Sequence, residues 1–400
     1  RLVVNRAAAE LPRADEISVD WQTALFTLAV SLLTAAAFGM LPAWRLGAFD
    51  PQESLKAGSH TTTESRSSGR VRSLLVGTQT ALGATLLIFA GLLSTSLFRL
   101  LNVDKGFQTQ RVLTSEIVLP STQYKSLDSR TRFYDRALAE LRALPGVDTA
   151  ALYSHMPLSG QVWVNPLTIE GDERPLLQHP MANVRFVSPN FFHTLSMDLV
   201  AGRPFTEADR GRNVAILSEG AVQTLWPGLN PLGRTVKTGG PDSPSCEVIG
   251  VVRDTRVVTL DSDPVRLAYF PFWQQSRTHA VLIVRTAADP LAMAGAIRRA
   301  VHQADAQVPI AKVTTMDGLV DQAVARRRFQ ATLALGFALF ALLLAGLGVY
   351  GVVSYWVERR RTELGIRVAL GAQGGRLFGM VLGRGLLPVG AGLVCGLAAA

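Results

Sequence analysis

Residues 329–357, FQATLALGFALFALLLAGLGVYGVVSYWV, contain no charged side chain and decide the fold of this chain. A run of about 29 uncharged residues exceeds the roughly 20 that a helix needs to cross the apolar core of a bilayer. Only helices and closed barrels satisfy every backbone polar group in lipid, and residues 335–347 lack the alternation of polar and apolar residues that is typical of a barrel strand. The stretch therefore predicts a transmembrane helix.

Two more uncharged runs predict membrane helices earlier in the chain, over residues 22–43 and 74–98. Between them, residues 59–73 are rich in Ser, Thr, Gly and Arg, which predicts a flexible linker. A further apolar run starts at residue 385 and continues to residue 400. Because no Met opens the sequence and the sequence stops inside this last run, we expect it to be a piece of a longer protein.

The positive charge of the chain is concentrated beside the predicted membrane helices. The formal net charge is +9, and residues 43–73 and 357–384 hold excesses of two and four positive charges. Lys and Arg are enriched in cytoplasmic loops, so we expect both segments in the cytoplasm and residues 104–325 on the other side of the membrane. A basic surface with interleaved aromatic residues would favour a nucleic-acid partner, and the sequence outside these segments contains no such pattern.

Residues 104–325 are long enough for one large soluble domain or two small ones. Helical periodicity predicts helices over 128–144 and 290–303. Strands with intervening helices favour an α+β domain with split βαβ units, and the Gly- and Pro-rich residues 202–240 favour a separate strand-rich lobe. The predicted strands are 111–119, 149–153, 183–187, 214–217, 247–252 and 281–284.

Motifs for catalysis or cofactor binding are absent from the sequence or out of place in it. No phosphate-binding loop occurs, and the six histidines lack the spacing of metal ligands. The sequence GLGVYG over 346–351 matches a dinucleotide-binding pattern, but no strand precedes it. We predict no catalytic, cofactor-binding or metal-ligating residue. Small residues that let membrane helices approach closely explain these glycines better, and the same interpretation applies to Gly375, Gly379 and Gly383.

Two further features have structural interpretations. Cys246 falls in the soluble region and Cys395 in a predicted membrane helix, so we do not expect them to form a disulfide. The aromatic residues over 269–273, YFPFW, favour core packing over a ligand surface.

The basic segment after the third predicted membrane helix predicts a short helix of its own. Thr362 is a candidate N-cap, and Glu363 and Arg367 have the i, i+4 spacing and order of a favourable ion pair. Apolar residues at 364–370 leave an apolar surface beside these charges. Two interpretations remain open: a juxtamembrane helix that binds anionic lipid headgroups, or a docking helix for a cytoplasmic partner.

Several stretches resemble one family. ERRRTELGIRVALGA, residues 358–372, resembles the cytoplasmic coupling segment of the MacB/FtsX-type ABC transporter permeases. Residues 1–58, which end in SLKAG, resemble the tail of a preceding permease copy, as in duplicated permeases of the acidobacterial type. Six short stretches resemble parts of the periplasmic domain of the family: LPGV (144–147), MPLSG (156–160), VSPNFF (187–192), GRPFT (202–206), PLGR (231–234) and VIGVVRD (248–254).

The resemblance implies a membrane α-helical permease with an α+β periplasmic domain, made of a split βαβ-like porter part and a strand-rich lobe. In this organisation residues 1–58 end a preceding FtsX-like permease unit, with a membrane helix at about 22–43 and a cytoplasmic tail. The later segments are a cytoplasmic linker (59–73), a membrane helix (74–98), a MacB-like periplasmic domain (104–325), a membrane helix (329–357), a cytoplasmic coupling segment (358–384) and the start of a further membrane helix (385–400).

The resemblance also implies a function, namely a non-catalytic, cofactor-free, multi-pass subunit in the bacterial inner membrane. A separate cytoplasmic ABC ATPase would bind the coupling segment, and its ATP hydrolysis would move the periplasmic domain for efflux or mechanotransmission. Membrane lipid and a second permease unit, in a dimer or in the same chain, are the other implied partners. The alternative is a non-transporting scaffold or sensor whose periplasmic domain binds a protein. The residues expected to contact the ATPase are Glu363, Gly365, Ile366, Arg367, Ala369 and Gly371.

Overall fold

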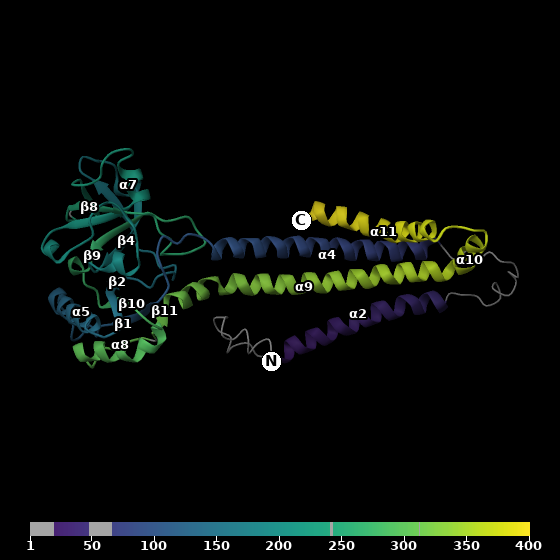
Figure 1. Ribbon diagram of the computed structural model, residues 1–400, viewed down its shortest axis with the longest axis horizontal. Helices are drawn as coiled ribbons and strands as arrows, with labels where there is room; N and C mark the ends of the chain where they lie inside the picture. Colours follow the sequence, from purple (N-terminus) through teal and green to yellow (C-terminus); the bar gives the residue numbers. More distant parts are fainter. Residues whose placement is uncertain (1–19, 48–65, 241–242, 312) are drawn as a thin grey trace. The chain divides into compact units, whose positions relative to one another are not determined.

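The computed structural model describes residues 20–47, 66–240, 243–311 and 313–400, and the chain divides into two compact units (Figure 1). The outer domain is Phe98–Val324, and the helical unit comprises the described residues before and after it. The predicted linker between residues 59 and 65, and the predicted cytoplasmic tail beyond residue 47, lie outside the described residues.

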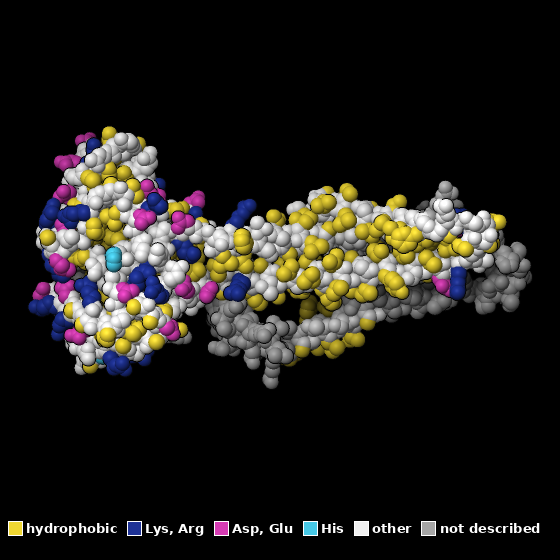
Figure 2. All heavy atoms as spheres, viewed as in Figure 1, with side chains coloured by type: hydrophobic (Ala, Val, Ile, Leu, Met, Phe, Trp, Pro, Cys, Tyr) yellow, Lys and Arg dark blue, Asp and Glu magenta, His cyan; other side chains and the backbone are white. Residues whose placement is uncertain are grey.

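The helical unit is built from long apolar helices. Three described segments are long and apolar enough to cross a membrane: Ser73–Leu101, Met316–Glu358 and Leu377–Ala399. Their large apolar side chains point outward, and the helices carry few charges along their length (Figure 2). Such a continuous apolar surface is unfavourable in water and favourable in lipid. The helices are α2 (Trp21–Gly47), α4 (Arg66–Leu101), α9 (Met316–Arg359), α10 (Arg361–Ala369) and α11 (Gly374–Ala399).

The helices extend beyond the uncharged runs from which they were predicted. Helix α4 begins at Arg66, so residues 66–72 are helical, and the prediction of a flexible linker is wrong for them. Helix α9 has 44 residues. At 1.5 Å per residue such a helix is about 66 Å long, roughly twice the apolar thickness of a bilayer. Helix α11 begins at Gly374, before the predicted start at residue 385.

Small residues bring α11 against α4. A Cβ at Gly392 would lie 2.3 Å from the carbonyl oxygen of Gly77, and one at Gly396 would lie 2.6 Å from that of Ala81. Close backbone approach of this kind is a common way for membrane helices to pack. A Cβ at Gly375, Gly379 or Gly383 would meet nothing within 4 Å among the described residues, so these glycines bring no helix of this chain into close contact, and their predicted role stays a prediction for contacts with another molecule.

The outer domain contains one continuous sheet in which the strand order is β11-β1-β10-β2-β4-β3-β7-β8-β6-β9, with β5 paired to β8. Its first part, β11-β1-β10-β2, is covered by helices α5 (Leu127–Arg142) and α8 (Pro290–Ala304), which pack against each other. This part is the predicted split βαβ unit. The strands are β1 (Val112–Val118), β2 (Val147–Tyr153), β10 (His279–Thr286) and β11 (Thr314–Thr315).

The second part of the sheet closes on itself. Strand β4 pairs with β3 and, in parallel, with β9, so that β4, β3, β7, β8, β6 and β9 form a ring. This ring is the strand-rich lobe, and it extends well beyond the predicted residues 202–240. Its strands are β3 (Val164–Ile169), β4 (Met181–Val187), β6 (Val214–Ser218), β7 (Thr235–Thr238), β8 (Cys246–Val252) and β9 (Leu267–Pro271), with β5 (Leu199–Gly202) beside β8. Short helices α6 (Phe191–Thr194), α7 (Glu219–Leu225), η2 (Leu176–Gln178), η3 (Glu207–Asp209) and η4 (Phe272–Gln274) complete it.

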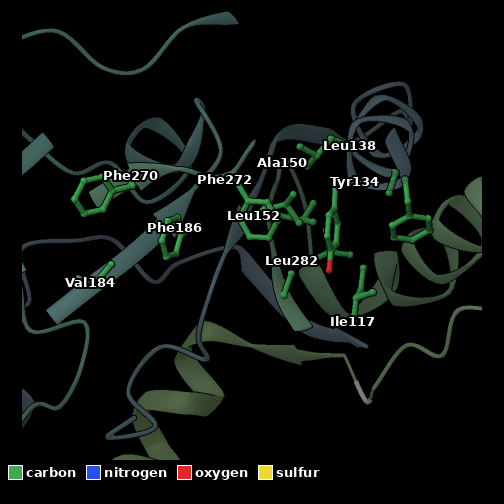
Figure 3. Packing of buried hydrophobic residues seen from close by; sticks show 14 of the residues in the cluster. Ile117, Tyr134, Leu138, Ala150, Leu152, Val184, Phe186, Phe270, Phe272 and Leu282 are labelled. Carbon is green, nitrogen blue, oxygen red and sulfur yellow. The ribbon is translucent and has the colours of Figure 1, made fainter. Parts of the chain in front are cut away.

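One buried apolar cluster runs through both parts of the outer domain (Figure 3). Tyr134 and Leu138 of α5 pack in it with Leu152 of β2, and Phe186 and Phe270 extend it into the ring. Phe270 and Phe272 of the aromatic stretch over 269–273 lie in this cluster, and Tyr269 is fully buried in a second cluster, which confirms the prediction of core packing. Cys246 and Cys395 are both free, as predicted.

Candidate docking segment

The predicted coupling residues lie on and directly after α10, a short helix between the two long helices α9 and α11. Helix α9 ends at Arg359, and the turn at Arg360 separates it from α10. The helix N-cap is Arg360, so the predicted capping role of Thr362 is wrong: Thr362 already lies inside the helix. The change of direction at Arg360 makes α10 a separate element.

An ion pair fixes the charged side of α10. Arg367 donates to Glu363 at 2.7 Å, which confirms the predicted i, i+4 pair, and Arg360 lies 3.3 Å from the same carboxylate. The other terminal nitrogen of Arg367 lies 3.5 Å from the sulfur of Met380 in α11. The guanidinium of Arg360 also stacks on Trp356, 5.1 Å from the ring centre. Exposed pairs contribute at most about 1 kcal/mol each, so this network orients the helix more than it stabilises it.

Helix α10 also has an exposed apolar surface beside its charged residues. Ile366 is 57% exposed and Leu370, at the C-cap, is 82% exposed, with Val368 exposed beside them. In the part of the chain that the structure describes, nothing covers this surface. Val368 and Leu370 are not among the residues predicted to contact the ATPase, although they lie in the same apolar stretch.

The two glycines of the segment have different structural roles. Gly371 has a φ of +87°, and its N–H donates to the carbonyl of Val368 while that of Ala372 donates to Arg367. These two bonds form the Schellman cap that ends α10, so Gly371 is required by the backbone. Gly365 lies in the helix, and a Cβ there would meet nothing within 4 Å. Its absent side chain leaves room for close approach by another molecule.

The remaining predicted residues are also accessible. Glu363 and Ala369 are exposed, and Gly371 ends the helix. Among the described residues, no group of three or more His, Cys, Asp or Glu side chains is placed to hold a metal ion.

The membrane-crossing helices, the short exposed helix between them and the separate α+β domain define a class: a multi-pass membrane protein with a permease-like helix arrangement. Residues 80–303 match the family described as MacB-like periplasmic core domain, and residues 335–400 match the family described as FtsX-like permease C-terminal. The first match covers more than half of the chain. The chain therefore belongs to this family and is an ABC transporter permease of the MacB/FtsX type, located in the bacterial inner membrane with a periplasmic domain.

Two relatives of the chain are named as export proteins. It is 27% identical over 206 residues to the probable syringafactin export ATP-binding/permease protein SyfD of Pseudomonas syringae, covering 48% of this chain and 30% of that protein. It is 26% identical over 306 residues to the macrolide export ATP-binding/permease protein MacB of Burkholderia cenocepacia, covering 72% of this chain and 43% of that protein. The chain thus spans less than half of the length of either relative.

A solved structure is also similar. The crystal structure of the periplasmic region of MacB from Actinobacillus actinomycetemcomitans aligns with a TM-score of 0.38 and 15% identity, and covers 55% of this chain and 95% of that one.

Proposed function

We propose that this chain is the permease subunit that couples ATP hydrolysis by a separate cytoplasmic ABC ATPase to motion of its periplasmic domain. The observation that carries the proposal is the surface of α10, where exposed Ile366 and Leu370 lie beside the Glu363–Arg367 ion pair. An amphipathic helix that is uncovered in its own chain is suited to a groove in a partner. Gly365 allows a close approach of the two backbones.

The continuity of α9 supports transmission of motion. The helix runs without interruption from Met316, in the outer domain, to Arg359, one residue before α10. Continuous helices can carry coupling between distant sites, so we expect a displacement of α10 to be transmitted along α9 toward Met316. Met316 is fully buried in the core of the outer domain, so that end of the helix cannot move independently of the domain.

The chain itself is non-catalytic, and lipid surrounds its helices. Residues 1–58 end a preceding permease unit, which pairs with the unit that follows, or two chains form a dimer. Substrates are given only in the names of the export relatives, and we assign none of them to this chain. The ATP-driven motion of the periplasmic domain serves either efflux or the transmission of force.

Substitution of Gly365 by Leu tests the docking role. Because the added side chain meets nothing in this chain, we expect the Gly365→Leu variant to fold and insert normally and to lose its ATPase partner. The tagged chain is purified in mild detergent from its native host, and ATP hydrolysis is measured in the eluate and after reconstitution in lipid. If the variant retains full ATPase activity in the eluate, α10 is not part of the interface with the ATPase.

A matched control separates docking from general disturbance. Gly295 is an exposed helical glycine in α8 of the outer domain, and the nearest atom to a Cβ there is 4.0 Å away. We expect Gly295→Leu to co-purify with the ATPase as the unmodified chain does. If no ATPase accompanies even the unmodified chain, the scaffold or sensor alternative is favoured.

A further inference from the structure

Arginines lie at the periplasmic ends of two membrane helices. In α9, residues 326–328 are all arginine and directly precede the uncharged run 329–357, and in α4, Arg99 directly follows the uncharged run 73–98. Figure 2 shows Lys and Arg side chains at these ends of the long helices, where the continuous apolar surface begins. Lys and Arg are enriched in cytoplasmic loops, so the orientation of the chain in the membrane does not explain arginines on this side.

Three of these arginines have no acidic partner in the chain. On a helix, an acid three or four residues away can pair with an arginine, as Asp128 does with Arg132 at 3.0 Å. No Asp or Glu has this spacing from Arg99, Arg326 or Arg328. The three side chains are exposed, and none forms an ion pair or a hydrogen bond with the described residues. Their charges are therefore open to a partner outside the chain.

The packing of α9 on α4 shows where the arginines of α9 point. Ala334 of α9 is buried with Ala90 of α4 in a small apolar cluster. Arg327 lies seven residues before Ala334, hence on the same face of the helix, and is partly buried. Arg326 and Arg328 each lie about 100° around the helix from Arg327. They therefore flank the contact between the two helices and point toward lipid on either side of it.

Arg99 points away from the same contact on α4. It lies nine residues after Ala90, which is about 180° around the helix from the face that packs on α9. Arg99 and Arg328 are each the first charged residue beyond an uncharged run, and Arg326 is only about 3 Å further along the axis of α9. All three guanidinium groups thus lie at the depth of the lipid headgroups.

Each of these arginines has an exposed leucine on its own face, about two helical turns closer to the bilayer centre. Residues seven positions apart on a helix lie on nearly the same face. The leucines at this spacing from Arg99, Arg326 and Arg328 are Leu92, Leu333 and Leu335, which are 62%, 41% and 48% exposed. A positive charge at headgroup depth above an apolar side chain matches the two parts of a phospholipid.

We infer that Arg99, Arg326 and Arg328 bind the phosphate groups of anionic phospholipids in the periplasmic leaflet of the inner membrane. A guanidinium group donates two parallel N–H bonds to phosphate oxygens, and basic side chains near a membrane surface attract anionic lipid. The exposed leucines favour a lipid over a free phosphate ion, because only a lipid has acyl chains to cover them. This inference concerns lipid and holds or fails independently of ATPase coupling.

The test uses the full chain in lipid nanodiscs with a fluorescent probe beside one arginine. Leu333→Cys is labelled with bimane in a Cys395→Ala background, and lipids brominated on their acyl chains quench the probe on contact. Brominated phosphatidylglycerol, which is anionic, and brominated phosphatidylcholine, which has no net charge, are compared at equal mole fraction. We expect phosphatidylglycerol to quench the probe more strongly, because Arg326 on the same face holds its phosphate.

Variants with a matched control decide the assignment. We expect Arg326→Gln to lower the enrichment of phosphatidylglycerol at the probe by about fivefold, the factor expected for one arginine near a membrane surface. Arg132→Gln is the control, because it removes the same charge from a 69% exposed position in the outer domain. Thermal unfolding verifies the folding of each variant.

Two further pairs of changes repeat the test at the other arginines and decide it if Arg326→Gln does not fold. They are Leu335→Cys with Arg328→Gln, and Leu92→Cys with Arg99→Gln. The inference is overturned if the two lipids quench the probes equally, or if Arg132→Gln lowers the enrichment as much as Arg326→Gln. It is also overturned if inorganic phosphate, exchanged for chloride at constant ionic strength, removes the preference, since the arginines would then bind a soluble anion.

Discussion

Gly392 in α11 and Gly77 in α4 lie so close that a Cβ on the first would be 2.3 Å from the carbonyl oxygen of the second. Real Cβ atoms do not approach a backbone oxygen to this distance, so the two helices can pack in this way only with glycine at residue 392. The contact joins residues more than 300 positions apart and ties the last described helix to α4.

Substitution of Gly392 is expected to separate these helices. Gly392→Leu inserts a side chain at the contact, and overpacking of this kind typically costs about 1–3 kcal/mol. Gly390 is the matched control, because nothing lies within 4 Å of its Cβ direction. Thermal unfolding in detergent should show a lower midpoint for Gly392→Leu and an unchanged one for Gly390→Leu. Equal midpoints for both would contradict the packing.

Asp209 is expected to make stability of the outer domain pH-dependent. The buried carboxylate accepts from both terminal nitrogens of Arg203 at 2.7 Å and from the N–H of Thr206 at 2.9 Å. The Arg203 guanidinium, followed by the Thr206 bonds, holds the pKa of Asp209 below its ordinary value. A lowered pKa contributes stability that is complete above about pH 4 and is lost as the pH falls toward the native pKa.

The Asp209→Asn variant tests this dependence. We expect a free energy of unfolding about 1–3 kcal/mol lower at pH 7, because Asn leaves the Arg203 charge without its partner. Urea titrations followed by tryptophan fluorescence should show that the difference from the unmodified chain shrinks below pH 4. Asp198→Asn is the control, since Asp198 is exposed and lies 3.8 Å from Arg253. A constant difference from pH 7 to pH 2 would refute the assignment.

Arg367 distinguishes a docking contact from a helix-stabilising one. Arg367→Glu puts two carboxylates at i, i+4 where the structure has a 2.7 Å ion pair, and we expect the ATPase to dissociate while membrane insertion persists. The double variant Glu363→Arg/Arg367→Glu restores an ion pair with reversed charges. If the partner contacts Arg367 directly, co-purification stays low in the double variant. Full recovery would mean that the pair only stabilises α10.

The side of the membrane on which α10 lies can be measured by cysteine labelling. Ile366→Cys and Val162→Cys place thiols at sites of similar exposure, 57% and 59%, in a Cys395→Ala background. Burial raises the pKa of Cys246 to about 11, so this residue is expected to remain unreactive. A maleimide that reaches the periplasm and does not cross the inner membrane should label Val162→Cys only. Labelling of Ile366→Cys in intact cells would show that α10 lies on the periplasmic side and that the predicted topology is wrong.

The local elements of this fold could be predicted from sequence where the periodic signal was strong. The helices α5 and α8 and strands such as β1 and β10 lie within a few residues of their predicted bounds. Strands β3 and β9 were missed: β3 contains Pro166 and β9 ends at Pro271. Proline lowers the apparent strand propensity, although a strand accommodates it at its end or where the missing N–H is not needed for pairing.

The sequence could not predict which face of a helix packs against its neighbour, or which distant strands pair. The glycines at 375, 379 and 383 have the spacing of a packing face, but the spacing does not say which side of α11 meets α4, and Gly392 and Gly396 make that contact. Likewise, the parallel pairing of β4 with β9 joins residues about 84 positions apart, and no local pattern marks it.

The closed ring of the strand-rich lobe has a consequence for assembly. An exposed sheet edge is a template on which another chain can add a strand, and it also promotes aggregation. The pairing of β4 with β9 closes the ring, and the free edges that remain among the described strands are short: β5, four residues long, pairs with β8 alone, and β11 is two residues long. These short edges offer little backbone for the addition of another strand, so we expect other proteins to recognise this lobe mainly through its side chains and loops, and misfolded copies to find little edge on which to aggregate.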